Sequence, residues 1–129
     1  MRIEYEAENF PPSLGVNGSG YLDVSWDDLV WAAVTIGRPG RAYLFQHGAS
    51  SVYEAIFRCS LVRMALEQRG ARSTWFTRTP AFKALDPTEK GAVSYFLGMV
   101  LCKLFAHKVL NTPWLLHLGR GLINSAARV

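Results

Sequence analysis

The pattern of hydrophobic and polar positions predicts a long buried helix in the C-terminal third of the chain, over residues 87–110. Its first half carries no charged side chain from Gly91 to Cys102, and Lys103 follows directly. A membrane span needs about 20 largely apolar residues, so this shorter run is typical of a core helix and argues against a membrane span. We expect the first three turns to run through the middle of the domain and the last two to emerge at the surface.

The residues around both ends of this helix are typical helix boundaries. At the start, Asp86 can accept a hydrogen bond from a backbone N–H, Pro87 suits the first helical position and Glu89 completes a capping box. Near the other end, Asn111 and Pro113 prevent continuation. The helix dipole favours the basic residues of the last turns, which are Lys103, His107 and Lys108. Another backbone could approach closely along one side, where the small residues are Gly91, Ser94, Gly98 and Cys102.

A second long helix is predicted over residues 51–69, ending at Gly70. It has two apolar faces instead of one. The first consists of Val52, Ala55, Ile56, Cys59, Val62 and Leu66, and the second of Tyr53, Phe57, Leu61, Met64 and Ala65. The borders between the faces carry charged pairs spaced four residues apart, Glu54 with Arg58 and Arg63 with Glu67. The two charged borders indicate that each apolar face is buried against a different surface.

Two interpretations of this second helix remain open. In one, the helix is sandwiched inside the domain, and both faces belong to the core. In the other, the stripe of Tyr53, Phe57, Leu61 and Met64 is a surface for a protein partner or for self-association, because aromatic residues and Met bordered by Arg are typical of interface cores. Replacing Phe57 by Asp would unfold the chain in the first case and would only disrupt association in the second.

The N-terminal part of the chain predicts a small sheet and a third helix. Residues 2–8 alternate between apolar and charged side chains, which is the pattern of a half-buried edge strand. Residues 9–20 are rich in Pro, Gly, Asn and Ser and are expected to form a mobile loop, followed by a short strand over residues 21–24. A helix is expected over residues 26–36, capped by Ser25.

Three shorter segments complete the pattern. Residues 38–41, Arg-Pro-Gly-Arg, predict a solvated turn, and residues 42–45 are apolar enough for a short strand. Near the end of the chain, Thr112 can cap a short helix that begins at Pro113. This helix would carry Trp114, Leu115 and Leu118. The segment that follows it has only weak helical character.

Together these elements predict one domain over residues 1–129, of the mainly helical α+β class. The expected architecture is compact, with the two long helices (51–69 and 87–110) at its centre and a small N-terminal β-sheet beside them. A chain of 129 residues is long enough to bury one core without disulfides or metals. The same pattern also fits one subunit, or a piece, of a larger assembly.

Charge divides the chain into an acidic start and a basic remainder. Residues 1–28 hold six acidic side chains and one Arg, a balance of −5, whereas residues 29–129 hold four acidic and thirteen basic side chains, a balance of +9. This asymmetry indicates that the acidic segment covers part of a basic body, or that the basic part meets an acidic partner. The acidic N-terminal sequence has no apolar leader pattern, which predicts a cytoplasmic protein. Cys59 and Cys102 are expected to be reduced core thiols.

The loop at residues 46–51 has the most site-like sequence of the chain. It leads from a predicted strand into a predicted helix, where Ser51 and Glu54 suggest a capping box. His47, Gly48, Ser50 and Ser51 are therefore candidates for binding a small anion on backbone N–H groups. The loop matches no Walker or dinucleotide fingerprint, so no cofactor is expected. His47 and Ser50 could also act as base and nucleophile, but no third group is recognisable, and the three histidines show no metal-ligand spacing with the cysteines.

A basic and aromatic segment, residues 69–83, joins the two long helices. Such a mixture can neutralise phosphates and stack on bases. The candidate nucleic-acid-binding residues are Arg69, Arg72, Trp75, Arg78 and Lys83, interleaved with Phe76 and Phe82. The segment contains no RRM, helix-turn-helix or zinc-finger signature, and its aromatic residues could instead anchor the loop to the core.

These observations order the functional hypotheses. The first is a non-catalytic interaction module that acts through protein-protein contacts in an oligomer or larger complex. The second is nucleic-acid binding through residues 69–83, and the third is an enzyme or small-anion binder at residues 46–51. No metal site and no membrane contact are expected.

Overall fold

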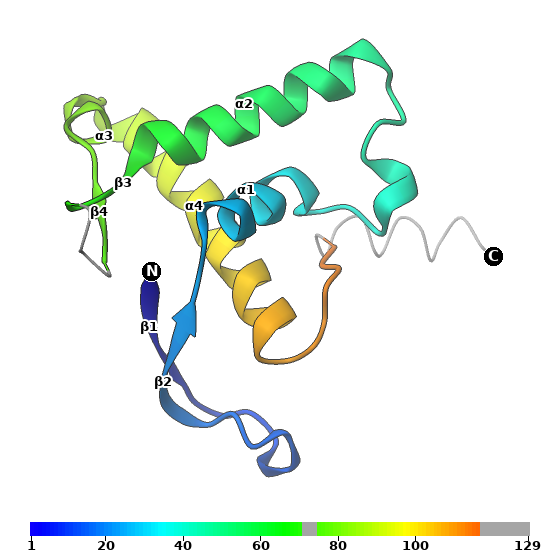
Figure 1. The fold of residues 1–129 in the computed structure, drawn as a ribbon, viewed down its shortest axis with the longest axis vertical. Coiled ribbons are helices and arrows are strands. Elements are labelled where there is room, and N and C mark those ends of the chain that lie inside the picture. The colour runs from blue at the N-terminus through cyan, green and yellow to red at the C-terminus, as the bar shows by residue number, and fades with distance from the viewer. Residues whose placement is uncertain (71–74, 117–129) are drawn as a thin grey trace.

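The computed structural model describes residues 1–70 and 75–116, which form a mainly helical α+β structure (Figure 1). This is the predicted fold class. The strands are β1 (Arg2–Ala7), β2 (Gly18–Asp23), β3 (Leu66–Gln68) and β4 (Phe76–Arg78). The helices are α1 (Trp26–Thr35), α2 (Ala49–Ala65), α3 (Pro80–Ala84) and α4 (Pro87–Lys108), and two 3₁₀ turns lie at Pro12–Leu14 and Arg41–Tyr43. In Figure 1, α2 runs across the top of the molecule and the β1–β2 hairpin lies towards the bottom.

The N-terminal hairpin pairs β1 with β2 in antiparallel register, with Tyr5 opposite Gly20. The predicted alternation is confirmed, because the acidic side chains of β1 are exposed while Tyr5 packs edge-on against Phe105 of α4, with ring centroids 5.0 Å apart. Gly20 has no room for a side chain, since a Cβ there would lie 2.6 Å from Cζ of Tyr5. The prediction of a loop throughout 9–20 was wrong: β2 already begins at Gly18, because the strand pairs along its whole length with β1.

Helix α1 is the centre of the main core and packs against both α2 and α4. Ser25 caps it as predicted: its Oγ accepts from the Asp28 N–H at 3.0 Å, and the Asp28 carboxylate accepts from the Ser25 N–H at 2.9 Å. Lys108 of α4 lies 2.9 Å from the same carboxylate. Partial burial opposes ionisation, but the hydrogen bond from Ser25 and the ammonium of Lys108 together hold the pKa of Asp28 below its ordinary value.

The main core is formed by small and branched side chains from the hairpin and three helices. It consists of Leu22, Val24, Leu29, Ala32, Ala33, Val62, Val100 and Leu104. A smaller cluster of Ala65, Phe82 and Val93 joins α3 to the ends of α2 and α4. Only the C-terminal half of α2 contributes to these clusters, which leaves its N-terminal half outside the core.

Helix α2 ends at Ala65 and not at the predicted residue 69, and it begins at Ala49, two residues earlier than predicted. After Ala65 the chain becomes extended at Leu66 and enters β3, which pairs with β4. Thr79 explains this ending, because its N–H donates to the Ala65 carbonyl at 3.1 Å and its hydroxyl donates to the Met64 carbonyl. At the start, Gly48 occupies the capping position and provides no side chain, so the predicted capping box of Ser51 and Glu54 was wrong.

Helix α4 begins with the predicted capping box. The Asp86 carboxylate accepts from the Thr88 and Glu89 N–H groups at 2.7 Å and 3.1 Å, and Glu89 accepts from the Asp86 N–H at 3.3 Å. The predicted order of burial was wrong, because the early turns are largely exposed and the buried residues concentrate in the later turns, at Val100, Lys103, Leu104 and Ala106. The cause is that α1, the hairpin and residues 112–116 all pack around the second half of this helix.

The small-residue side of α4 faces outward. Apart from the chain neighbours and the backbone of α4 itself, no atom of the described residues lies within 4 Å of a Cβ built at Gly91 or at Gly98, so the expected close approach of another backbone does not occur there. Residues 42–45 do not form the predicted strand, because Arg41–Tyr43 is a 3₁₀ turn. Residues 112–116 are not helical, and the predicted position of Leu118 lies outside the described residues. Among residues 1–70 and 75–116, none of the helices is both long and apolar enough to cross a membrane.

We expect Ser25→Ala to lower the free energy of unfolding by about 1 kcal/mol, because the first turn of the central helix loses its side-chain cap. Urea denaturation followed by circular dichroism would measure this change. Ser94→Ala, at an exposed position of α4, is the matched control and should change the free energy by less than ~0.5 kcal/mol. Equal denaturation midpoints for Ser25→Ala and the unmodified chain would contradict the assigned role of the cap.

Candidate functional site

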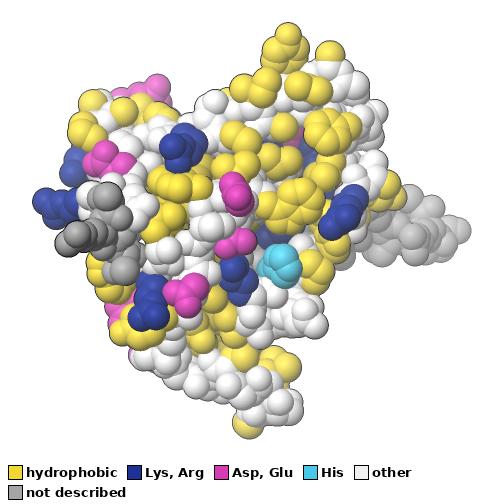
Figure 2. Space-filling view, viewed as in Figure 1, with side chains coloured by type: hydrophobic (Ala, Val, Ile, Leu, Met, Phe, Trp, Pro, Cys, Tyr) yellow, Lys and Arg dark blue, Asp and Glu magenta, His cyan; other side chains and the backbone are white. Residues whose placement is uncertain are grey.

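The N-terminal half of α2 presents an exposed apolar ridge. Val52, Tyr53, Ile56 and Phe57 are 47%, 71%, 55% and 62% exposed, respectively. We call these four residues the α2 ridge. Hydrophobic side chains gather in the upper part of the molecule in Figure 2, where α2 lies in Figure 1. The prediction of two buried faces was therefore wrong for Val52 and Ile56, which share one exposed surface with the two aromatic residues.

A groove continues from the ridge along the C-terminal half of α2. It lies between α2 and α4 and has a volume of about 420 Å³. The lining residues are Phe57, Leu61, Met64, Leu85, Glu89, Ala92, Val93 and Phe96. We call this hollow the α2–α4 groove. Apart from Glu89, which also caps the start of α4, its lining is apolar.

The four residues predicted as a partner interface all border these two features. Tyr53 and Phe57 stand on the ridge, whereas Leu61 and Met64 are half-buried in the groove. The sequence alone missed the α4 side of the groove, because Ala92 and Phe96 were assigned to a buried helix. The first half of α4 has no charged side chain from Gly91 to Cys102, so its sequence does not distinguish an exposed side from a buried one.

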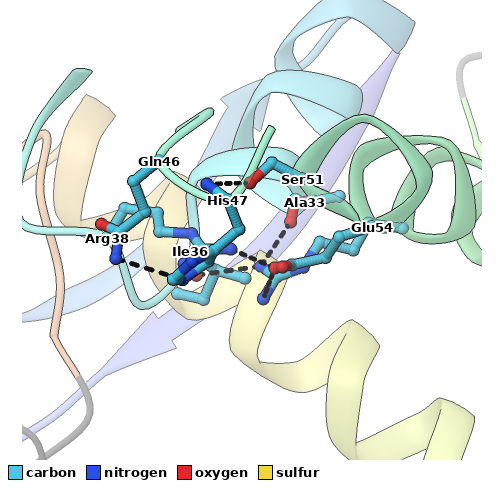
Figure 3. A network of polar contacts seen from close by, with 8 residues as sticks. Ala33, Ile36, Arg38, Gln46, His47, Ser51 and Glu54 are labelled. Carbon is cyan, nitrogen blue, oxygen red and sulfur yellow. Dashed lines mark hydrogen bonds and ion pairs between the residues drawn. The ribbon is translucent and has the colours of Figure 1, made fainter. Parts of the chain in front are cut away.

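A polar network beneath the ridge attaches α2 to the end of α1 (Figure 3). The Arg58 guanidinium donates to the carbonyl oxygens of Ala33 and Ile36 at 3.0 Å and 2.9 Å, which satisfies the last turn of α1. Glu54 forms ion pairs with Arg58 at 2.9 Å and with Arg38. Arg38 is buried, so the predicted solvated turn at residues 38–41 was wrong at this position. The network directs the charged side of α2 inward and its apolar side outward.

The candidate anion-binding loop does not form a converged site. His47, Gly48 and Ser50 are exposed, whereas Ser51 is buried and its Oγ accepts the His47 N–H at 3.0 Å (Figure 3). The Ser51 hydroxyl is therefore used within the loop. The carboxylate of Glu54 follows in the first turns of the same helix and is paired with Arg38 and Arg58. In the described part of the chain, no three His, Cys, Asp or Glu side chains converge as metal ligands.

The basic and aromatic segment is divided between the surface and the core. Arg69, Arg78 and Lys83 are exposed, Trp75 is 49% exposed, and Arg72 lies outside the described residues. The two phenylalanines are occupied elsewhere. Phe76 packs edge-on against Trp26, with ring centroids 5.0 Å apart, and Phe82 is buried in the smaller core cluster. In this segment's described part, Trp75 is thus the exposed aromatic residue.

Lys103 is the most unusual titratable group of the structure. Its side chain is 1% exposed, and its Nζ lies 4.7 Å from the ring centroid of Trp114. Within the described ranges, no hydrogen-bond acceptor meets this Nζ. Burial lowers the pKa of Lys103 from 10.5 to about 8. The tryptophan is held in turn by Trp31, at 6.4 Å between centroids, and the next residue, Leu115, accepts the Gly37 N–H at 3.1 Å.

Comparison with known proteins found no matching family model, no similar curated protein and no similar solved structure. Of the features described above, the α2 ridge and the α2–α4 groove combine exposure, apolar character and a defined shape. Lys103 is buried and is not directly accessible to a partner.

We expect Lys103→Met to stabilise the fold at pH 7 by about 1 kcal/mol. Relief of a buried charge is worth roughly 1–4 kcal/mol, and loss of the cation–π contact with Trp114 offsets up to ~2 kcal/mol of it. Thermal unfolding of both chains would measure the difference. Lys83→Met, at an exposed position, is the control and should have little effect.

The same variant has a defined pH dependence. Because the pKa of Lys103 is lowered in the folded state, the unfolded chain binds more protons between pH 8 and 10.5, and the stability of the unmodified chain rises with pH across that window. Lys103→Met should lose this contribution, so its stabilising effect shrinks as the pH rises through 8. A stabilisation that is the same at pH 7 and pH 10 would contradict burial of the charge.

Proposed function

We propose that this protein is a non-catalytic interaction module whose α2 ridge and α2–α4 groove bind a protein partner in an oligomer or larger complex. One observation carries the proposal. Four large apolar side chains stand exposed on one side of a helix, next to an apolar groove, with no charged side chain among them. Contiguous exposed apolar surface bordered by aromatic residues and Met is typical of interface cores.

The size of this surface agrees with a binding role. The four ridge residues expose roughly 400 Å² of apolar area, given the areas typical of such side chains. Burying that area is worth about 10 kcal/mol at 25 cal/mol per Å². Association itself costs roughly 4–15 kcal/mol, so contacts in the groove are needed as well for a measurable affinity.

The charges near α2 favour a protein partner over a phosphate-rich one. Arg38 and Arg58 are directed inward and share Glu54. Arg63, an exposed basic residue in the last turn of α2, stacks on Trp26 with its guanidinium 4.0 Å from the ring centroid. Nucleic acids and anionic membranes are bound mainly through basic side chains that neutralise phosphates, and the ridge offers none.

The proposal can be tested by site-specific photo-crosslinking inside cells that naturally express the protein. A benzoylphenylalanine at position 53 should form covalent adducts with protein, because Tyr53 is the most exposed residue of the ridge. The same photo-crosslinker at position 21 is the matched control, since Tyr21 is 59% exposed but belongs to the β1–β2 hairpin, which lies away from α2 (Figure 1). Mass spectrometry would identify the crosslinked chains.

Phe57→Asp, combined with the crosslinker at position 53, should abolish these adducts and leave the circular dichroism spectrum and melting temperature nearly unchanged. Phe57 is largely exposed, so an Asp there costs the fold little but places a charge in the contact. Equal adduct formation at positions 53 and 21, or none at 53, would refute the interaction surface.

Nucleic-acid binding at residues 69–83 is the second candidate. It is supported by the exposed Trp75 at the β3–β4 hairpin, with Arg69, Arg78 and Lys83 exposed on the same segment. If this candidate is correct, fluorescence anisotropy should show binding of a labelled single-stranded oligonucleotide that weakens roughly tenfold or more between low and physiological salt. Arg69→Glu with Lys83→Glu should remove this binding, whereas Arg41→Glu, outside the segment, should not.

A further inference from the structure

The α2 ridge and the α2–α4 groove occupy opposite halves of one helix. Helix α2 spans Ala49–Ala65, 17 residues, so Phe57 is its midpoint. The protruding residue Tyr53 lies before this midpoint, and the groove residues Leu61 and Met64 lie after it. A protrusion and a hollow on either side of one point are the two halves of a self-complementary surface.

The spacing of the stripe supports the same symmetry. Ser50, Tyr53, Phe57, Leu61 and Met64 follow one another at intervals of three, four, four and three residues. This order of intervals is the same in both directions along the helix. Residues at such intervals lie on one side of a helix, so two antiparallel copies of α2 present matching positions to each other.

We propose that the partner of this surface is a second copy of the chain, bound through antiparallel α2 helices about a two-fold axis at Phe57. The inference rests on the proposed function, because it names the partner of the same surface. Phe57 meets its equivalent at the axis. Tyr53 of each copy enters the groove of the other beside Leu61, so this contact forms twice, whereas the contact between the two Phe57 side chains forms once.

The charges of α2 permit this arrangement. The stripe carries no charged residue, so no like charges meet at the axis. Glu54 and Arg58, the charged residues nearest to Phe57, are paired with each other at 2.9 Å on the inner side of the helix. An acidic or basic partner would find no complementary charge on the stripe. A second copy of the same uncharged stripe matches it.

The area predicts a weak dimer. Of the four ridge residues only Tyr53 and Phe57 lie on the stripe, so each copy contributes roughly 250 Å² from these two side chains and a further area from the groove, whereas a stable interface buries about 800 Å² per partner. Interfaces below that size form transient complexes. We therefore expect a dissociation constant on the order of 1–100 µM.

Sedimentation equilibrium and disulfide trapping of the full chain test the inference together. The mass should rise from 14.4 kDa towards twice that value as the concentration increases from about 1 µM to about 500 µM. Phe57→Asp should keep the lower mass throughout. For trapping, Cys59 and Cys102 are replaced by Ser, and single cysteines are introduced on α2.

The antiparallel register makes specific predictions for the trapped species. Phe57→Cys should oxidise to a covalent dimer, because the two copies of position 57 face each other at the axis. Tyr53→Cys alone should form little dimer, whereas Tyr53→Cys combined with Leu61→Cys should form it readily. In a parallel arrangement, Tyr53→Cys and Phe57→Cys would trap equally well, and this outcome would overturn the proposed register.

The remaining outcomes separate the inference from the proposed function. A chain that stays monomeric at every concentration, while the photo-crosslinker at position 53 captures a different protein, overturns the second copy and retains the interaction surface. A monomer without any adduct at position 53 overturns both. Circular dichroism of each cysteine variant confirms its fold, and the mass of the unmodified chain provides a test that depends on no substitution.

Discussion

The contact of Arg58 with the end of α1 determines the orientation of α2, on which the proposed surface depends. Its guanidinium satisfies two terminal carbonyls of α1 and is paired with Glu54, which also holds the buried Arg38. Because charge-assisted hydrogen bonds are strong, these partners hold the Arg58 side chain against the C-terminal end of α1. Because one side of α2 is fixed there, the opposite side, with Tyr53 and Phe57, faces solvent. The exposed ridge is thus a consequence of where the polar partners of this helix lie.

Local signals in the sequence predicted the elements whose ends are determined by nearby residues. The cap at Ser25 and the capping box at Asp86 placed the starts of α1 and α4 correctly, and the alternation in residues 2–8 identified β1. The end of α2 could not be found in this way. The carbonyl of Ala65 at this end accepts a hydrogen bond from the Thr79 N–H. Thr79 lies 14 residues further along the chain and comes close only because β3 pairs with β4.

Burial was harder to predict than secondary structure, because it depends on which elements meet. The uncharged first half of α4 resembles a core helix in sequence, yet the core forms around its second half, where Lys103 is buried. Exposure of Tyr53 and Phe57 on α2 was one of two interpretations left open, since aromatic residues at helical spacing are visible in the sequence but do not show what covers them. The continuation of the stripe into the groove was not predicted, because Ala92 and Phe96 contribute to it only once α4 crosses α2.

The burial of Lys103 beneath Trp114 makes its amine a natural reporter of opening at this end of the molecule. Acylating reagents need an accessible, unprotonated amine, and trypsin needs an extended, exposed backbone on either side of a lysine. In the closed structure neither condition holds at Lys103, because its side chain is 1% exposed and its backbone is helical. The rate at which Lys103 becomes labelled therefore measures how often residues 112–116 separate from α4.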